Sequence, residues 1–154
     1  MITQIAFQKS EKYSSFLDVL VSASITIWTK SKFYHVAIKV GDYWYTSLPS
    51  KGVVKFTELP LEDYEIIEVK HRKLHPEQYA IMMEYIESQI GLGYDWVGIL
   101  FSQVFSFGIN SSSKWFCSEY TTKILQLMYV KEVIDEIPNK VSPARLYQLL
   151  KGTK

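Results

Sequence analysis

The sequence has one cysteine in 154 residues, Cys117, and therefore no internal disulfide. A lone thiol is typical of proteins in a reducing compartment and argues against a small secreted fold held together by disulfides. The most apolar segment, residues 96–109, is interrupted by polar residues and is shorter than the roughly 20 residues of a membrane-spanning helix. The first residues lack the basic start and apolar run of a secretory signal. We therefore expect a cytoplasmic protein with no integral membrane segment, located in the host cytoplasm or the virion if a phage encodes it.

Neither sign of charge is in excess, since 17 Lys and Arg residues face 16 Asp and Glu residues. This balance does not indicate a nucleic-acid partner. His71 and His75 have the spacing of metal ligands on a helix, but Pro76 follows at once and no acidic or cysteine ligand is near. We expect no metal and no cofactor. Nothing in the sequence indicates an oligomeric state.

Aromatic residues, by contrast, are abundant, at 15% of the chain with 11 Tyr and 4 Trp. They fill cores, and they also line grooves that hold extended substrates.

Apolar periodicity predicts strands in the first half of the chain and helices in the second. Strands are expected over 2–7, 33–40, 43–47, 53–56 and 64–69, and helices over 14–21, 76–90, 95–105, 117–130 and from 143 onward. Gly41-Asp42 predicts a hairpin between two of the strands, and Ser142 with Pro143 is a typical helix start. This order predicts one α+β domain over residues 1–154, with a small, largely antiparallel meander packed against helices.

Cys117 lies where the helical pattern begins. A thiol at a helix N-terminus is near outward-pointing N–H groups and the positive end of the helix dipole, which favour the thiolate. The alternative is a packing role, because free cysteine is among the most buried residue types. The serines at 111–113 indicate that this helix start lies near the surface, which favours a functional thiol.

His35 is the histidine with the best context for chemistry. A cysteine and a histidine that are far apart in sequence but adjacent in space make a minimal nucleophile and base. The alternative is an ordinary histidine in an apolar strand. Strand alternation places His35 on one face with Ala37 and Lys39.

Five short motifs occur in an order that resembles a known family. They are Tyr34-His35-Val36-Ala37-Ile38, Gly41-Asp42, Tyr94-Asp95-Trp96-Val97-Gly98, Trp115-Phe116-Cys117-Ser118-Glu119 and Val141-Ser142-Pro143. Over roughly residues 2–150 the chain resembles the circularly permuted papain-like proteins of the NlpC/P60 superfamily, in particular the YiiX/YebB-type and related phage-encoded members. The histidine precedes the cysteine here, as in the permuted branch.

The resemblance implies a papain-like core, in which the cysteine helix packs on a small antiparallel sheet that bears the histidine. It implies that Cys117 is the nucleophile, His35 the base and Tyr94 an aid to oxyanion stabilisation. At the third family position many members carry a carboxylate or a histidine. This chain offers Thr46 or Ser47, which would orient His35 more weakly.

The function that the resemblance implies is a cysteine peptidase or amidase that cleaves an amide bond, in a peptide or peptidoglycan-like substrate of the bacterial cell wall, through an acyl-enzyme. Two alternatives stay open. One is an acyltransferase or lipid-amide hydrolase of the permuted branch, with residues 96–107 lining an acyl channel. The other is a non-catalytic module that binds a peptide or a protein, which the missing carboxylate favours.

Overall fold

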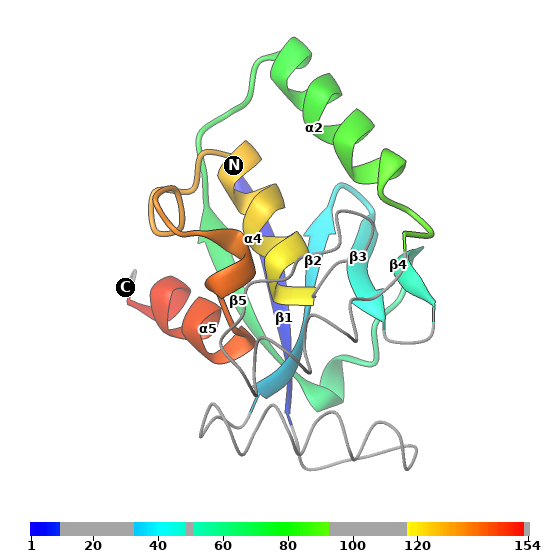
Figure 1. Cartoon of the computed structure of the whole chain (residues 1–154), viewed down its shortest axis with the longest axis vertical. Helices are drawn as coiled ribbons and strands as arrows, with labels where there is room; N and C mark the ends of the chain where they lie inside the picture. Colours follow the sequence, from blue (N-terminus) through cyan, green and yellow to red (C-terminus); the bar gives the residue numbers. More distant parts are fainter. Residues whose placement is uncertain (10–32, 49–50, 93–116, 153–154) are drawn as a thin grey trace.

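The structure is a computed structural model, and it describes residues 1–9, 33–48, 51–92 and 117–152. Within these ranges the chain forms a five-stranded antiparallel sheet and three α-helices (Figure 1). The elements are β1 (Ile2–Lys9), β2 (Phe33–Val40), β3 (Tyr43–Leu48), β4 (Gly52–Phe56), the 3-10 turn η1 (Leu61–Asp63), β5 (Tyr64–Lys70), α2 (Pro76–Ser88), α4 (Cys117–Leu127), the 3-10 turn η2 (Pro138–Lys140) and α5 (Pro143–Lys151). The predicted α+β class is confirmed.

The strand order β4-β3-β2-β1-β5 corrects the expected meander. Strands β2, β3 and β4 do follow one another, but β5 pairs with β1 and not with β4. The reason is the apolar character of β1, where Ile5, Ala6 and Phe7 are all fully buried. A strand buried on both faces belongs inside a sheet, with a neighbour on each side.

The predicted element boundaries hold to within a few residues. Strand β2 has the predicted limits, and α2 begins at Pro76 as expected. The helix that starts at Cys117 ends at Leu127, earlier than the predicted residue 130, and Tyr129 then takes a positive φ of 58°. The helices predicted over 14–21 and 95–105 lie outside the described residues.

One face of the sheet carries the main core. Its β2 side chains, Val36, Ile38 and Val40, form one buried cluster with residues of α4 and α5, which lie on this side of the sheet in Figure 1. Seven of the eleven residues of α4 are buried, and they lie around most of its circumference. A helix buried in this way is a central element of a fold, not a surface helix.

The other face holds a smaller apolar cluster of Ala6, Ala37 and Trp44, against which four partly buried side chains pack. The register between β2 and β3 pairs Lys39 with Trp44. Alternation from that pair places His35 and Thr46 on this second face.

Helix α5 begins as the sequence predicts, with Pro143 as its first residue. The Ser142 hydroxyl accepts a hydrogen bond from the Arg145 N–H at 3.2 Å. We expect Ser142→Ala to lower the free energy of unfolding by about 1 kcal/mol, because the first turn loses its cap. Urea unfolding measures this, with Ser142→Asp as the control that keeps a capping oxygen. Equal stability of wild type and Ser142→Ala would contradict the prediction.

Within the described ranges, no helix has both the length and the apolar character needed to cross a membrane.

Candidate functional site

The site is built around the backbone of Val36, just before the ladder between β2 and β3. That ladder runs from the Ile38–Tyr45 pair to the Val40–Tyr43 pair. At Val36, side chains supply the hydrogen bonds. The Thr46 hydroxyl donates to the Val36 carbonyl at 2.6 Å, and the Val36 backbone hydrogen-bonds the Cys117 sulfur. A residue from β3 and a residue from α4 thus converge at the backbone of Val36, which follows His35 in sequence.

Cys117 is the first residue of α4 and is only 2% exposed. Burial raises the pKa of its thiol to about 11, while hydrogen bonds from the backbone of Val36, Ser118 and Cys117 itself act in the opposite direction with smaller effect. The expectation that this helix start lies near the surface is therefore wrong for Cys117. The thiol is neutral at pH 7 because the desolvation of a thiolate outweighs the N–H groups of the helix start.

His35 lies near the start of β2, is 7% exposed and has a defined partner. Its Nε2 lies 3.0 Å from Thr46 Oγ1. The Thr46 hydroxyl has one proton, and it donates that proton to the Val36 carbonyl. Toward His35 it can therefore only accept, so Nε2 carries a proton. In the neutral ring, Nδ1 is then the basic nitrogen.

Cys117 and His35 come from opposite halves of the chain, and both lie near the Val36 backbone. The link is Val36, which follows His35 in sequence and whose backbone binds the Cys117 sulfur. The N-terminal end of α4, yellow in Figure 1, lies against the sheet at this point. Both residues that the sequence singled out thus lie next to Val36, and alternation places the His35 side chain on the face of the sheet opposite the Val36 side chain, which packs with α4.

Of the two hydroxyls considered for orienting His35, that of Thr46 is hydrogen-bonded to the ring. Ser47 is fully buried, pairs with Val53 in β4 and, by alternation, takes the opposite face of β3 from Thr46. Tyr94 lies outside the described residues.

Sequence reasoning missed Tyr64, the first residue of β5. Gln8 of β1 pairs with His35 on one side and with Tyr64 on the other, so the three residues form one row across the sheet. Burial raises the pKa of Tyr64 well above its usual value, and the charges of Tyr34 and Cys117 raise it further. The phenol is therefore within electrostatic range of the sulfur. Finding Tyr64 would have required the strand order. The expected meander places β5 beside β4 and far from His35, whereas β5 in fact pairs with β1.

No set of three or more His, Cys, Asp or Glu side chains in the described part of the chain is placed to hold a metal ion. His71 and His75, which have the sequence spacing of metal ligands, lie in a loop and at the N-cap of α2, respectively. His71 Nδ1 donates to the Arg72 carbonyl at 2.9 Å. The arrangement around Cys117 offers a thiol, an imidazole and backbone N–H groups, which suit nucleophilic chemistry.

Comparisons with protein-family models, with curated proteins and with solved structures give no match to this chain.

Proposed function

We propose that the chain is a cysteine hydrolase of amide bonds with a permuted papain-like fold, and that its substrate is a cell-wall peptide. The observation that carries the proposal is the hydrogen bond between the Cys117 sulfur and the Val36 backbone, beside a histidine that Thr46 orients. The order of the elements, with the histidine strand before the cysteine helix, supports the permuted papain-like assignment. The cell-wall substrate rests on the resemblance of the motifs alone.

In the proposed mechanism the thiol is neutral until substrate binds. His35 Nδ1 takes the thiol proton as the sulfur attacks the carbonyl carbon, which avoids a free buried thiolate. Backbone N–H groups at the start of α4 stabilise the oxyanion, together with Tyr94 as the family pattern implies. His35 then passes the proton to the leaving amine, and water hydrolyses the thioester to release the acid and regenerate the thiol. Thr46 acts throughout as a positioning residue, which holds the ring by its Nε2–H.

A second candidate is a non-catalytic module that binds a peptide. The observation that favours it is the burial of Cys117, since a thiol with a pKa of about 11 is a poor nucleophile in its resting state. In this candidate Cys117 is a packing residue of the core.

Soluble muropeptides from digested peptidoglycan, analysed by liquid chromatography and mass spectrometry, separate the two candidates. We expect the wild type to release cleaved stem peptides and Cys117→Ala to release none, with circular dichroism as the control that the variant folds. Cleavage that is unchanged in Cys117→Ala would overturn the role of the nucleophile. Binding of muropeptides by both proteins without any cleavage would favour the second candidate.

A further inference from the structure

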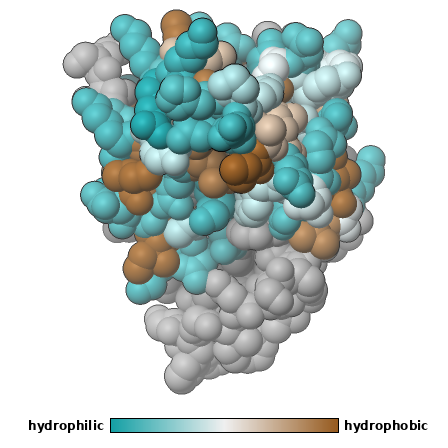
Figure 2. Space-filling model, turned by 90° about the horizontal axis from the view of Figure 1, so that it is seen from above, coloured by the Kyte–Doolittle hydropathy of each residue, from teal (hydrophilic) through white to brown (hydrophobic). Residues whose placement is uncertain are grey.

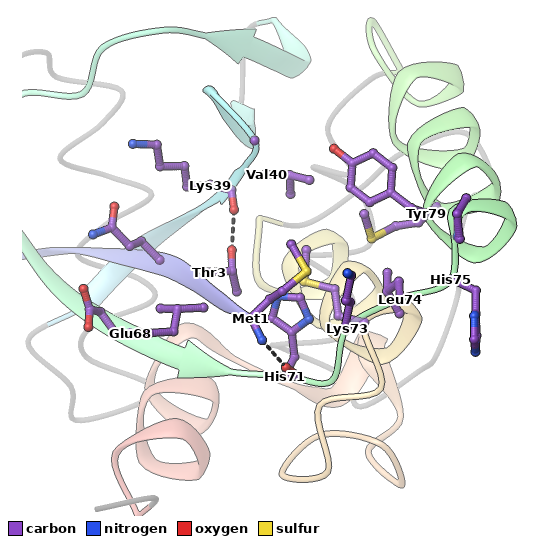
Figure 3. Close-up of a pocket in the computed structure, with 16 residues that line it drawn as sticks. Met1, Thr3, Lys39, Val40, Glu68, His71, Lys73, Leu74, His75 and Tyr79 are labelled. Carbon is purple, nitrogen blue, oxygen red and sulfur yellow. Dashed lines mark hydrogen bonds between the residues drawn. The ribbon is translucent and has the colours of Figure 1, made fainter.

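A groove of about 990 Å³ lies at the other end of the sheet from Cys117. It is bordered by the start of β1, the turn between β2 and β3, the segment after β5, and α2 (Figure 3). His35 and Val40 are five residues apart on β2, which places the groove roughly 17 Å along the strand from the candidate site. Its volume is at the upper end of the range for small-molecule sites. The groove is therefore separate from the proposed catalytic residues.

The floor of the groove is apolar. Val40, Leu74, Met82 and Met128 line it and are all buried. Exposed hydrophobic side chains, Met1, Ile2 and Tyr79, continue the apolar lining to the rim. Figure 2 views the molecule from above and shows hydrophobic side chains set among hydrophilic ones on that face. Methionine is flexible and polarisable, so such a floor adapts well to an alkyl chain.

The positive and negative side chains of the groove lie in different parts of it. Lys73 lies in its middle, beside Met1 and Leu74 in Figure 3, and forms no ion pair within the described ranges. Among the lining residues that the structure describes, Glu68 is the one carboxylate, and it lies on the side away from Tyr79. The N-terminus of α2, which begins at Pro76, adds a positive dipole end at the groove. A single negative charge beside Lys73 is thus favoured, whereas a second one near Glu68 is repelled.

We propose that this groove binds an aliphatic monocarboxylate, a molecule of the fatty-acid class. Its alkyl chain lies on the floor formed by Val40, Met82 and Met128, and its carboxylate pairs with Lys73. Two other ammonium groups belong to lining residues, but that of Lys39 lies over the Trp44 ring and that of the N-terminus donates to the His71 carbonyl. Lys73 is the ammonium that remains to pair with one anionic head above the apolar floor. The site is independent of the proposed hydrolase, so either can fail without the other.

The four methionines allow a direct test by NMR of the full chain labelled with ¹³C in the methionine methyl groups. Met82 and Met128 line the groove, while their neighbour Met83 packs against the core and does not line it. We expect decanoate, added below its micelle concentration, to shift the signals of Met82 and Met128 saturably and that of Met83 much less. Methionine-to-leucine variants assign the signals.

Two controls test the carboxylate. Lys73→Gln should weaken decanoate binding about fivefold, as expected for an exposed ion pair, and the matched variant Lys51→Gln, at the β3–β4 turn, should leave it unchanged. Decanol, which has the same chain without the charge, should bind more weakly than decanoate. The proposal is overturned if no saturable shift occurs or if the Met83 signal responds as strongly as that of Met82. It is also overturned if Lys73→Gln binds decanoate as tightly as the wild type does, or if the wild type binds decanol as tightly as decanoate.

Discussion

The Cys117 thiol of the folded protein should react with iodoacetamide about 100-fold more slowly at pH 8 than the same thiol in the unfolded chain. Only the thiolate reacts, and burial raises the pKa of Cys117 to about 11 from its usual value of 9.0. At pH 8 these values give thiolate fractions of about 0.1% and 10%, respectively. Mass spectrometry of the alkylated protein, in buffer and in denaturant, measures the ratio. Limited access to the buried sulfur lowers the folded rate further.

The same shift makes stability depend on alkaline pH. The folded pKa is above the unfolded one, so the contribution of the neutral thiol is fully present below pH 9 and is lost as the pH rises through 11. Between pH 8 and pH 10 the wild type should lose about 1 kcal/mol more stability than Cys117→Ala. Buried tyrosines also lower stability at alkaline pH, because burial raises their pKa in the folded protein while they ionise near pH 10 in the unfolded chain. Both proteins contain them, so the comparison isolates the thiol.

A folded thiol that reacts at pH 8 as fast as the unfolded one would contradict burial as the dominant influence. It would show that the N–H groups of Val36 and Ser118 prevail and that the resting site holds a thiolate. The slow reaction that we expect implies instead that the proton leaves only during attack on a substrate. A hydrolase at this site must then use His35 as a true general base.

The sequence predicts the local features of the site better than its environment. Alternation in β2 assigns the correct face to His35, and the helix pattern starts α4 at Cys117. Both are local signals. The burial of Cys117 depends on how α4 packs against the sheet, and no neighbouring residue type encodes that packing. The serines before Cys117 therefore suggest more exposure than the folded chain gives it.

Local sequence patterns could not predict the order of the strands in the sheet. They could, however, decide which of Thr46 and Ser47 lies on the same face as His35. Alternation says which face a side chain takes, but not which strand lies beside it, so the pairing of β5 with β1 could not be predicted. The predicted hairpin at Gly41-Asp42 does fix the register of β3 against β2. Counting outward from that turn places Thr46, and not Ser47, on the face of His35.

Thr46→Val should release the His35 ring from its fixed tautomer and reduce any hydrolase activity by about 100-fold. The variant keeps the shape of the side chain but removes the hydroxyl that accepts from Nε2–H and donates to the Val36 carbonyl. Two buried polar groups then lose their partner, which should lower the free energy of unfolding by about 2–4 kcal/mol. Long-range ¹H–¹⁵N spectra of the histidine rings report the tautomer directly and need no substrate.

In the wild type these spectra should show His35 as the Nε2–H tautomer, and in Thr46→Val as a mixture of both tautomers. Thr46→Ser is the matched control, because it keeps the hydroxyl and should keep the wild-type spectrum. A merely structural threonine would lower stability in Thr46→Val but leave the tautomer unchanged. A wild-type ring protonated at Nδ1 when neutral would contradict the geometry at Val36, because Nε2 would then need a proton from the Thr46 hydroxyl, which already donates to the Val36 carbonyl.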